Sequence, residues 1–180
     1  MPSPRPLANP ADLFFAIGDT LLELIPEITV GNYDEFDKPV GDATVLIEFE
    51  RTMPATRGPD GRYAHDLAIT LHAVVARWRR WAPLEAVNLA TVIERIVDDN
   101  RWSLPPGQCE PPDPETLHSA PSIFQTGERG YEAWGVHFRQ TIYLGESWAE
   151  EDPVTTAPGG LAYAWQVDID DPDNYHPLHE

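Results

Sequence analysis

Hydrophobic and polar positions recur with different periods along the chain, and these periods predict its elements. From Asn9 to Pro26, apolar residues recur at spacings of three and four, which predicts an amphipathic helix. Asn9 can cap its start, Pro10 suits the first helical position, and Pro26 should end it. A second helix is expected from Pro83, with an apolar stripe that reaches Val97.

Three segments alternate between apolar and polar side chains, which is the period of half-buried strands. The expected strands comprise residues 41–52, a run from His65 toward Trp78, and residues 134–144. The turn-rich segment MPATRGPDGR joins the first two, which we interpret as an antiparallel pair. This order of elements predicts an α+β fold: a mostly antiparallel sheet of about four to five strands with two main helices packed on one face.

Two further segments do not follow these periods. Residues 103–122 hold six prolines, which a continuous helix or a central strand does not tolerate, so we expect a long surface loop and a candidate contact surface. Residues 146–180 hold nine acidic side chains and no Lys or Arg. We therefore expect one domain over residues 1–146 and an acidic C-terminal extension over residues 147–180. Within the extension, the alternation over residues 161–166 predicts a strand that docks on a sheet edge, its own or a neighbour's.

The charge balance excludes several classes of function. The chain has 180 residues, with 12 Lys and Arg against 30 Asp and Glu, and a formal net charge of −18. A surface this acidic repels phosphate backbones and anionic lipid, so neither nonspecific nucleic-acid binding nor membrane association is expected. The longest apolar stretches are far shorter than the roughly 20 residues of a membrane-spanning helix. No secretory signal is expected, and the single cysteine, Cys109, fits synthesis in a reducing cytosol.

Candidate catalytic and metal-binding residues do not form a recognisable motif. His65 and His72 lie seven residues apart, which places them on opposite faces of a strand and about 23 Å from each other. The aspartates of residues 168–173 lack the glycine and glutamate of a calcium-binding loop. We therefore assign no catalytic residue, metal or cofactor. A hydrolase that uses His65, Asp66 or Cys109 stays open as an alternative.

The most basic segment interleaves three arginines with two tryptophans: Arg77, Trp78, Arg79, Arg80 and Trp81. In isolation this pattern is typical of stacking and phosphate contacts on a nucleic acid. Three arginines nevertheless stand against a net charge of −18. We interpret the segment as a protein contact, because Arg and Trp are enriched at interface hot spots and Arg pairs bidentately with carboxylates. In a self-assembling ring it would face acidic residues of the next copy.

The succession of elements over residues 11–146 resembles a known family. An amphipathic helix is followed by the strand ATVLIEFER, a strand in YAHDLAITLHAVVARW, the helix EAVNLATVIERIVDDNRW and a late strand that begins GYEAWGVHFRQTIYLGE. This order resembles the bacteriophage tail-terminator, or tail-completion, proteins, the group of the lambda-like minor tail protein U and its relatives in Mu-like prophages. The Pro-rich loop and the acidic extension depart from the smaller members.

The resemblance implies a virion protein that is made in the host cytoplasm and has no catalytic residues. Such a subunit forms a homo-hexameric ring at the head-proximal end of the tail tube, where it contacts the tail tube protein and the head–tail connector. The ring stops tube polymerisation, and DNA passes through it as cargo without specific binding. Two other functions stay open: another neck or connector component, and a small acidic immunity or inhibitor protein that binds a basic partner.

An acidic bore would suit a ring through which DNA passes. Six copies at −18 each would carry a formal charge of −108, and carboxylates that line a bore repel phosphates within the roughly 8 Å Debye length at physiological salt. Asp34, Glu35 and Asp37, in the segment NYDEFD, are the candidate lumen-facing residues.

Overall fold

The computed structural model describes residues 7–35, 43–125, 127, 130–145, 162–164 and 175–177. The elements in chain order are α1 (Pro10–Leu24), β1 (Thr29–Asn32), the 3₁₀ helix η1 (Tyr33–Glu35), β2 (Ala43–Ala55), β3 (Tyr63–Ala76), α2 (Ala82–Val97), β4 (His118–Gln125), β5 (Tyr131–Leu144), β6 (Ala162–Ala164) and β7 (Tyr175–Pro177). The chain divides into two compact units, Met1–Glu146 and Ser147–Glu180. Each unit is described by itself.

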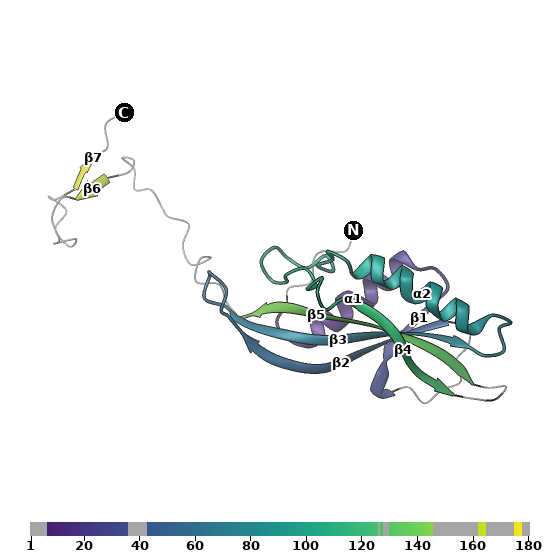
Figure 1. Ribbon diagram of the computed structural model, residues 1–180. Helices are drawn as coiled ribbons and strands as arrows, with labels where there is room; N and C mark the ends of the chain where they lie inside the picture. The colour runs from purple at the N-terminus through teal and green to yellow at the C-terminus, as the bar shows by residue number, and fades with distance from the viewer. Residues whose placement is uncertain are drawn as a thin grey trace. The chain divides into compact units, whose positions relative to one another are not determined.

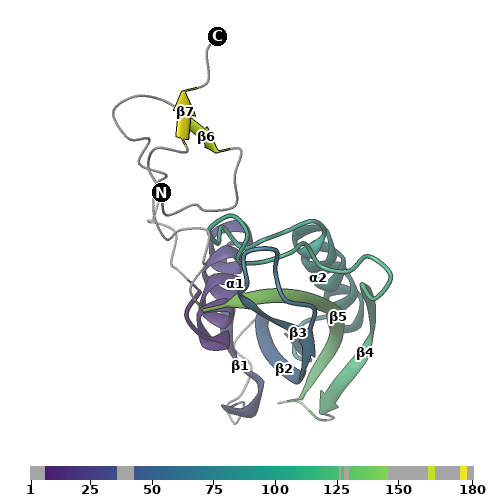
Figure 2. The ribbon, with the colours of Figure 1, turned by 90° about the vertical axis from the view of Figure 1, so that its left-hand side faces the viewer.

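The first unit is an α+β fold, as the sequence predicts. Its five-stranded sheet has the order β1-β2-β3-β5-β4, and all neighbours are antiparallel except β1 and β2, which are parallel. Helices α1 and α2 pack on the same face of this sheet (Figures 1 and 2). The longest pairing joins β3 and β5, whose register runs from Tyr63 opposite Leu144 to Ala76 opposite Tyr131.

The core lies between the helices and the sheet. Ile17 of α1 and Ile93 of α2 are fully buried against apolar side chains of β2, β3 and β5. Helix α1 starts where the sequence predicts, because Asn9 and Asp12 form a capping box. The Asn9 side chain accepts a hydrogen bond from the Ala11 N–H, and the Asp12 carboxylate accepts one from the Asn9 N–H, each at 3.0 Å.

Two strands of the sheet were not expected. Strand β1 has four residues, which is too short for a periodic signal. Strand β4 lies partly within residues 103–122, for which the prolines predict a loop. Pro121 is tolerated because β4 is an edge strand and its register shifts between Pro121 and Phe124. The loop prediction is therefore wrong for residues 118–122.

The rest of the Pro-rich segment, residues 103–117, lies alongside β5 and is hydrogen-bonded to it. The N–H groups of Glu110 and Asp113 donate to the backbone carbonyls of Thr141 and Arg139, at 2.9 Å each. These bonds continue the sheet edge beyond the part of β5 that pairs with β4. Residues 103–117 thus contain no helix or strand, as expected for a surface loop, and are anchored along β5. Their role as a contact surface stays a prediction.

A buried glutamine anchors the start of this segment. Gln140 of β5 is 1% exposed. Its Oε1 accepts a hydrogen bond from Trp102 Nε1 at 2.7 Å, and its Nε2 donates to the carbonyls of Asn100 and Glu110 at 2.9 and 2.8 Å. The bond to Trp102 satisfies an indole N–H that would otherwise be buried without a partner, because Trp102 is 2% exposed.

In the second unit, strand β6 pairs antiparallel with β7. Strand β6 lies within residues 161–166, where the alternation predicts a strand that docks on a sheet edge. Among the described residues its partner is instead another segment of the extension, Tyr175–Pro177.

Candidate functional site

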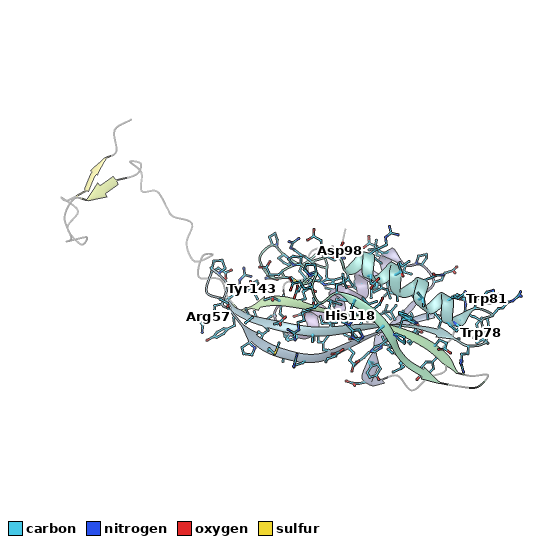
Figure 3. The ribbon with its side chains drawn as sticks, in the orientation of Figure 1. Arg57, Trp78, Trp81, Asp98, His118 and Tyr143 are labelled. Atoms are coloured by element: carbon cyan, nitrogen blue, oxygen red, sulfur yellow. The ribbon has the colours of Figure 1, made fainter. Side chains whose placement is uncertain are left out.

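The segment between β3 and α2 forms an exposed apolar corner. Residues 77–81 turn away from the sheet before α2 begins. Trp78 and Trp81 are 65% and 56% exposed, and Leu84, in the first turn of α2, is 61% exposed. Figure 3 shows Trp78 and Trp81 close together at one end of the sheet and Arg57 at the opposite end. We call Trp78, Trp81 and Leu84 the aromatic corner.

Two of the arginines predicted to make an interface hold the backbone of this corner. The Nη2 atom of Arg77 lies 2.7 Å from Oε1 of Glu132, on β5. Arg79 forms an ion pair with Glu85, in the first turn of α2. Both pairs join the turn to a regular element, so the aromatic corner is attached to β5 and to α2.

The third arginine, Arg80, keeps its charge at the surface. Its guanidinium lies over the Trp81 ring, 5.1 Å from the centroid, where the ring face attracts a cation. Arg80 is exposed, and no carboxylate of the described residues pairs with it. The corner therefore presents aromatic surface together with one positive charge that is not neutralised within the described part of the chain.

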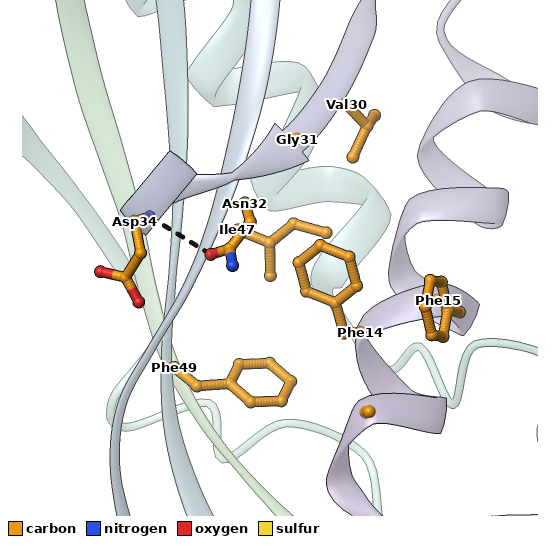
Figure 4. A pocket seen from close by; sticks show the side chains of 9 residues that line it. Phe14, Phe15, Val30, Gly31, Asn32, Asp34, Ile47 and Phe49 are labelled. Atoms are coloured by element: carbon orange, nitrogen blue, oxygen red, sulfur yellow. Dashed lines mark hydrogen bonds between the residues drawn. The ribbon is translucent and has the colours of Figure 1, made fainter. Parts of the chain in front are cut away.

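A second apolar surface is a groove of about 650 Å³ between α1 and the β1–β2 edge of the sheet. Phe14 and Phe15 of α1 line one side, and Ile47 and Phe49 of β2 line the other (Figure 4). The rings of Phe14 and Phe49 meet edge to face with centroids 6.4 Å apart, and Phe15 is 51% exposed. We call this surface the phenylalanine groove.

Asp34, one of the predicted lumen-facing acids, lies at the rim of the phenylalanine groove, far from Phe15 (Figure 4). Its N–H donates to Oδ1 of Asn32 at 3.3 Å. Its carboxylate is exposed and pairs with no cation of the described residues. Glu35 ends η1, but its side chain lies outside the described part, as does all of Asp37. The lumen-facing assignment of these acids stays a prediction.

The face of the sheet opposite the helices carries a chain of hydrogen-bonded polar groups. His72 is 4% exposed; its Nε2 lies 2.8 Å from Oε2 of Glu48, and its Nδ1 lies 3.0 Å from Oγ of Ser122. Strand β5 separates β3 from β4, and its residue opposite His72 is Gly135, which leaves room for the imidazole to reach across. The Tyr33 ring stacks on His72 with centroids 4.7 Å apart.

A second polar group on this face centres on Thr70. Its hydroxyl donates to Glu50, and Nδ1 of His137 lies 2.6 Å from the same oxygen. Because the hydroxyl has one hydrogen, the His137 ring must donate to it. The His118 ring stacks on His137 with centroids 5.0 Å apart. The hydrogen bond from Thr70 lowers the pKa of Glu50 below its ordinary value of 4.5, against the opposing effect of partial burial.

The chain of Glu48, His72 and Ser122 has the order of groups found in serine hydrolases, in which a carboxylate orients an imidazole that accepts the hydroxyl proton. A hydrolase also needs N–H donors for the oxyanion and space for a substrate beside the hydroxyl. The phenylalanine groove includes none of these three residues. Within the described ranges, no group of three or more His, Cys, Asp or Glu side chains is placed to hold a metal ion.

The residues of the hydrolase alternative, His65, Asp66 and Cys109, do not converge. His65 and Asp66 are neighbours on β3 and point to opposite faces of the sheet, and Oδ2 of Asp66 lies 3.9 Å from Nη1 of Arg139. His65 and Cys109 both pair with Ile142, along opposite edges of β5. Two strand spacings, about 10 Å, therefore separate their backbones.

Cys109 is also a poor nucleophile. The side chain is 4% exposed, and its Sγ donates to the Glu110 carbonyl at 3.4 Å. Burial raises the pKa of the thiol from 9.0 to about 12, and the Glu110 charge acts in the same direction. Since the thiolate is the reactive form, this cysteine is almost entirely in its unreactive form at neutral pH.

Comparison with known proteins found no matching family model and no significant match among curated proteins. Neither helix in the described part of the chain is long and apolar enough to cross a membrane. The function must therefore be inferred from the residues and surfaces described above.

Sequence reasoning singled out Trp78 and Trp81 of the aromatic corner but not Leu84, the phenylalanine groove or the polar groups. His72 and Ser122 are 50 residues apart, and only the register of β3, β5 and β4 brings them together. One signal was present in the sequence: Gly135 interrupts the side chains of a clear strand, and a glycine inside a strand often marks a close approach of neighbouring groups.

Proposed function

We propose that this protein is a noncatalytic structural subunit of a phage virion, a tail terminator that forms a ring at the head-proximal end of the tail tube. The ring ends tube polymerisation and joins the tail to the head–tail connector. The order of elements, with a first helix, a hairpin of long strands, a second helix and a late strand, supports this proposal through its resemblance to that family.

The aromatic corner is the observation that carries the proposal. Trp78, Trp81 and Leu84 are each more than half exposed and follow one another where the turn after β3 enters α2. Clustered exposed apolar side chains mark interaction sites, and Trp and Arg are the residues enriched in interface hot spots. The ion pairs of Arg77 and Arg79 attach this surface to the fold, so little ordering is required when a partner binds.

The charge of the chain supports a role beside moving DNA. A subunit with a net charge of −18 repels phosphates. Lysines in a bore would instead gain affinity from each counterion that DNA releases, and so would slow its transit.

Electron microscopy and native mass spectrometry of the purified protein, alone and with the tail tubes of its phage, test the proposal. We expect sixfold rings, or caps on one end of each tube. A strict monomer that binds a single basic protein would favour the inhibitor function. Rings that bind the head connector but leave tube ends free would favour another neck component.

Substitutions separate assembly from catalysis. We expect Trp78→Ala and Arg79→Glu to weaken ring or cap formation by about 30-fold, the usual scale of a hot-spot residue. His65→Ala and Cys109→Ala serve as controls and should leave assembly unchanged. Thermal unfolding of each variant separates loss of assembly from loss of the fold, which matters for Arg79→Glu because it also removes the ion pair with Glu85. Normal virion yield from Trp78→Ala and Arg79→Glu would contradict the proposal.

A hydrolase is the second candidate, and the contacts among Glu48, His72 and Ser122 are the observation that favours it. A fluorophosphonate probe, which labels activated serines, tests this function directly. A hydrolase should be labelled at Ser122 and lose the label in Ser122→Ala and His72→Gln. A structural subunit should show no label at this serine.

A further inference from the structure

The aromatic corner and the phenylalanine groove are both exposed apolar surfaces of the same subunit. We propose that they bind each other between copies, so that the aromatic corner of one subunit occupies the phenylalanine groove of the next. This inference rests on the proposed ring and adds to it the surfaces that form its repeating contact.

The apolar parts of the two surfaces fit in size and kind. The groove has a volume of about 650 Å³ and is walled by Phe14, Phe15 and Phe49. Aromatic rings pack well against other rings in offset or edge-to-face arrangements, and a buried tryptophan removes roughly 150–250 Å² from water. Because Trp78 and Trp81 are 65% and 56% exposed, burying their accessible parts would supply roughly 180–300 Å² of the roughly 800 Å² per partner that a standard interface buries.

The charges of the two surfaces are also complementary. Arg80 lies beside Trp81 on the corner, and Asp34 lies on the rim of the groove. Neither charge is paired within the described part of the chain. When the corner enters the groove, an ion pair between Arg80 and Asp34 would compensate both charges and set the orientation of the contact.

This complementarity identifies a second copy as the occupant. A partner with aromatic side chains beside a cation fits the groove, because phenylalanines form its walls and a carboxylate lies on its rim. The corner requires an apolar recess beside an anion, because it combines tryptophans with an arginine whose charge is not neutralised by a described carboxylate. The same chain supplies both, on different elements: the corner joins β3 to α2, and the groove lies between α1 and the β1–β2 edge.

Such a contact joins two different surfaces of identical chains. It repeats from copy to copy and gives a closed ring when the rotation per step closes, or an open filament when it does not. Such a contact would allow the chain to self-assemble without a second protein.

Charge reversal provides the test. Arg80→Glu and Asp34→Lys should each raise the concentration needed for half-assembly by about tenfold or more, as measured by sedimentation velocity. An equimolar mixture of the two variants should assemble again. The two introduced charges are opposite and face each other at one contact, and the unaltered Arg80 and Asp34 face each other at the next. The double variant Arg80→Glu/Asp34→Lys should assemble alone.

Arg95→Glu and Asp98→Lys are the matched controls. Both positions are exposed at the C-terminal end of α2, and the variants change the net charge by the same amounts. Neither should alter assembly, and their mixture should behave like each alone. Trp81→Ala tests the apolar part of the contact and should raise the half-assembly concentration about 30-fold without recovery in Asp34→Lys mixtures.

The outcomes separate this inference from the proposed function. If both charge-reversal variants form rings as the wild type does, the proposed contact between corner and groove is wrong, and the proposed terminator function is unaffected. A wild-type chain that stays monomeric at millimolar concentration would also overturn this contact, and capping of tube ends by that chain would then decide the proposed function separately. Loss of assembly without recovery in the mixture would show that the two residues do not face each other.

Discussion

Gly135 lies opposite His72 on one side and Ala120 on the other, so the space above it is the path by which the imidazole reaches β4. A Cβ atom at this position would lie 3.0 Å from Cγ2 of Thr70 and 3.0 Å from Nε2 of His137. Contacts this short require neighbouring groups to shift. We predict that Gly135→Ala lowers the free energy of unfolding by about 1–3 kcal/mol, the usual cost of overpacking.

Urea unfolding of Gly135→Ala and of the control Gly31→Ala measures this cost. A Cβ at Gly31 would meet Cδ2 of Leu46 at 3.5 Å, which is an ordinary contact. The control should therefore be nearly neutral. Equal stability of the two variants would contradict the steric role given to Gly135.

Cys109 should be inert in the folded protein. Its pKa of about 12, against the ordinary 9.0, lowers the thiolate fraction at neutral pH about a thousandfold. We predict reaction with a disulfide reagent at pH 7 that is slower than for a free thiol by at least about that factor, and rapid reaction in denaturant. Fast labelling of the native protein would show that the thiol is accessible and would revive it as a candidate nucleophile.

At the scale of elements, Gln140 connects the segment after α2 to the sheet. Replacing it with Met would leave the buried Trp102 Nε1–H without its acceptor. It would also remove one donor each from the carbonyls of Asn100 and Glu110, of which the second still accepts from Cys109 Sγ. Because a buried unsatisfied group costs about 1–3 kcal/mol, we predict that Gln140→Met destabilises the fold by about 1–3 kcal/mol.

Hydrogen exchange and urea unfolding check this prediction. Amides of residues 98–117 should exchange faster in Gln140→Met, while those of β3 keep their protection relative to the global stability. Thr141→Val, at the neighbouring half-buried position of β5, is the control and should change little. Unchanged exchange over residues 98–117 would contradict the anchoring role of Gln140.

The elements that the sequence predicts are those whose burial is periodic over many residues. Strand β3 runs for 14 residues and helix α1 for 15, so their alternation and helical stripe stand out. Strand β1 has four residues and β4 contains Pro121, so neither has a comparable signal. Their existence depends on neighbours: β1 needs the edge of β2, and β4 needs the edge of β5.

The candidate surfaces were only partly predictable for a related reason. The alternation of Trp78 and Trp81 with arginines singles them out in the sequence, although the strand predicted toward Trp78 ends at Ala76 in the structure. The phenylalanine groove combines Phe14 of α1 with Phe49 of β2, and these residues meet only after the helix has packed on the sheet. Single-sequence periodicity places each side chain on a face but does not tell which faces leave a space between them.

At the scale of the whole molecule, the division into two compact units predicts that residues 1–146 fold alone. The deleted segment, 147–180, carries eight of the 30 acidic residues and no Lys or Arg, so its removal also lessens the self-repulsion of the chain. We expect calorimetry of the truncated protein to show one cooperative transition within about 5 °C of that of the full chain. A broad or absent transition would show that the first unit depends on the extension.

Strands β3 and β5 pair without a register break over 14 residues, which at about 3.3 Å per residue gives a stiff span of roughly 45 Å. The aromatic corner lies at one end, and Arg57 lies over the Tyr63 ring at the other. If the corner is held in the groove of a neighbouring copy, as proposed, a tilt of about 5° there would displace the far end of these strands by about 4 Å. If all copies of a ring tilted together in this way, the ring would change in diameter at the Arg57 ends of its subunits. The contacts at the aromatic corners would hardly move.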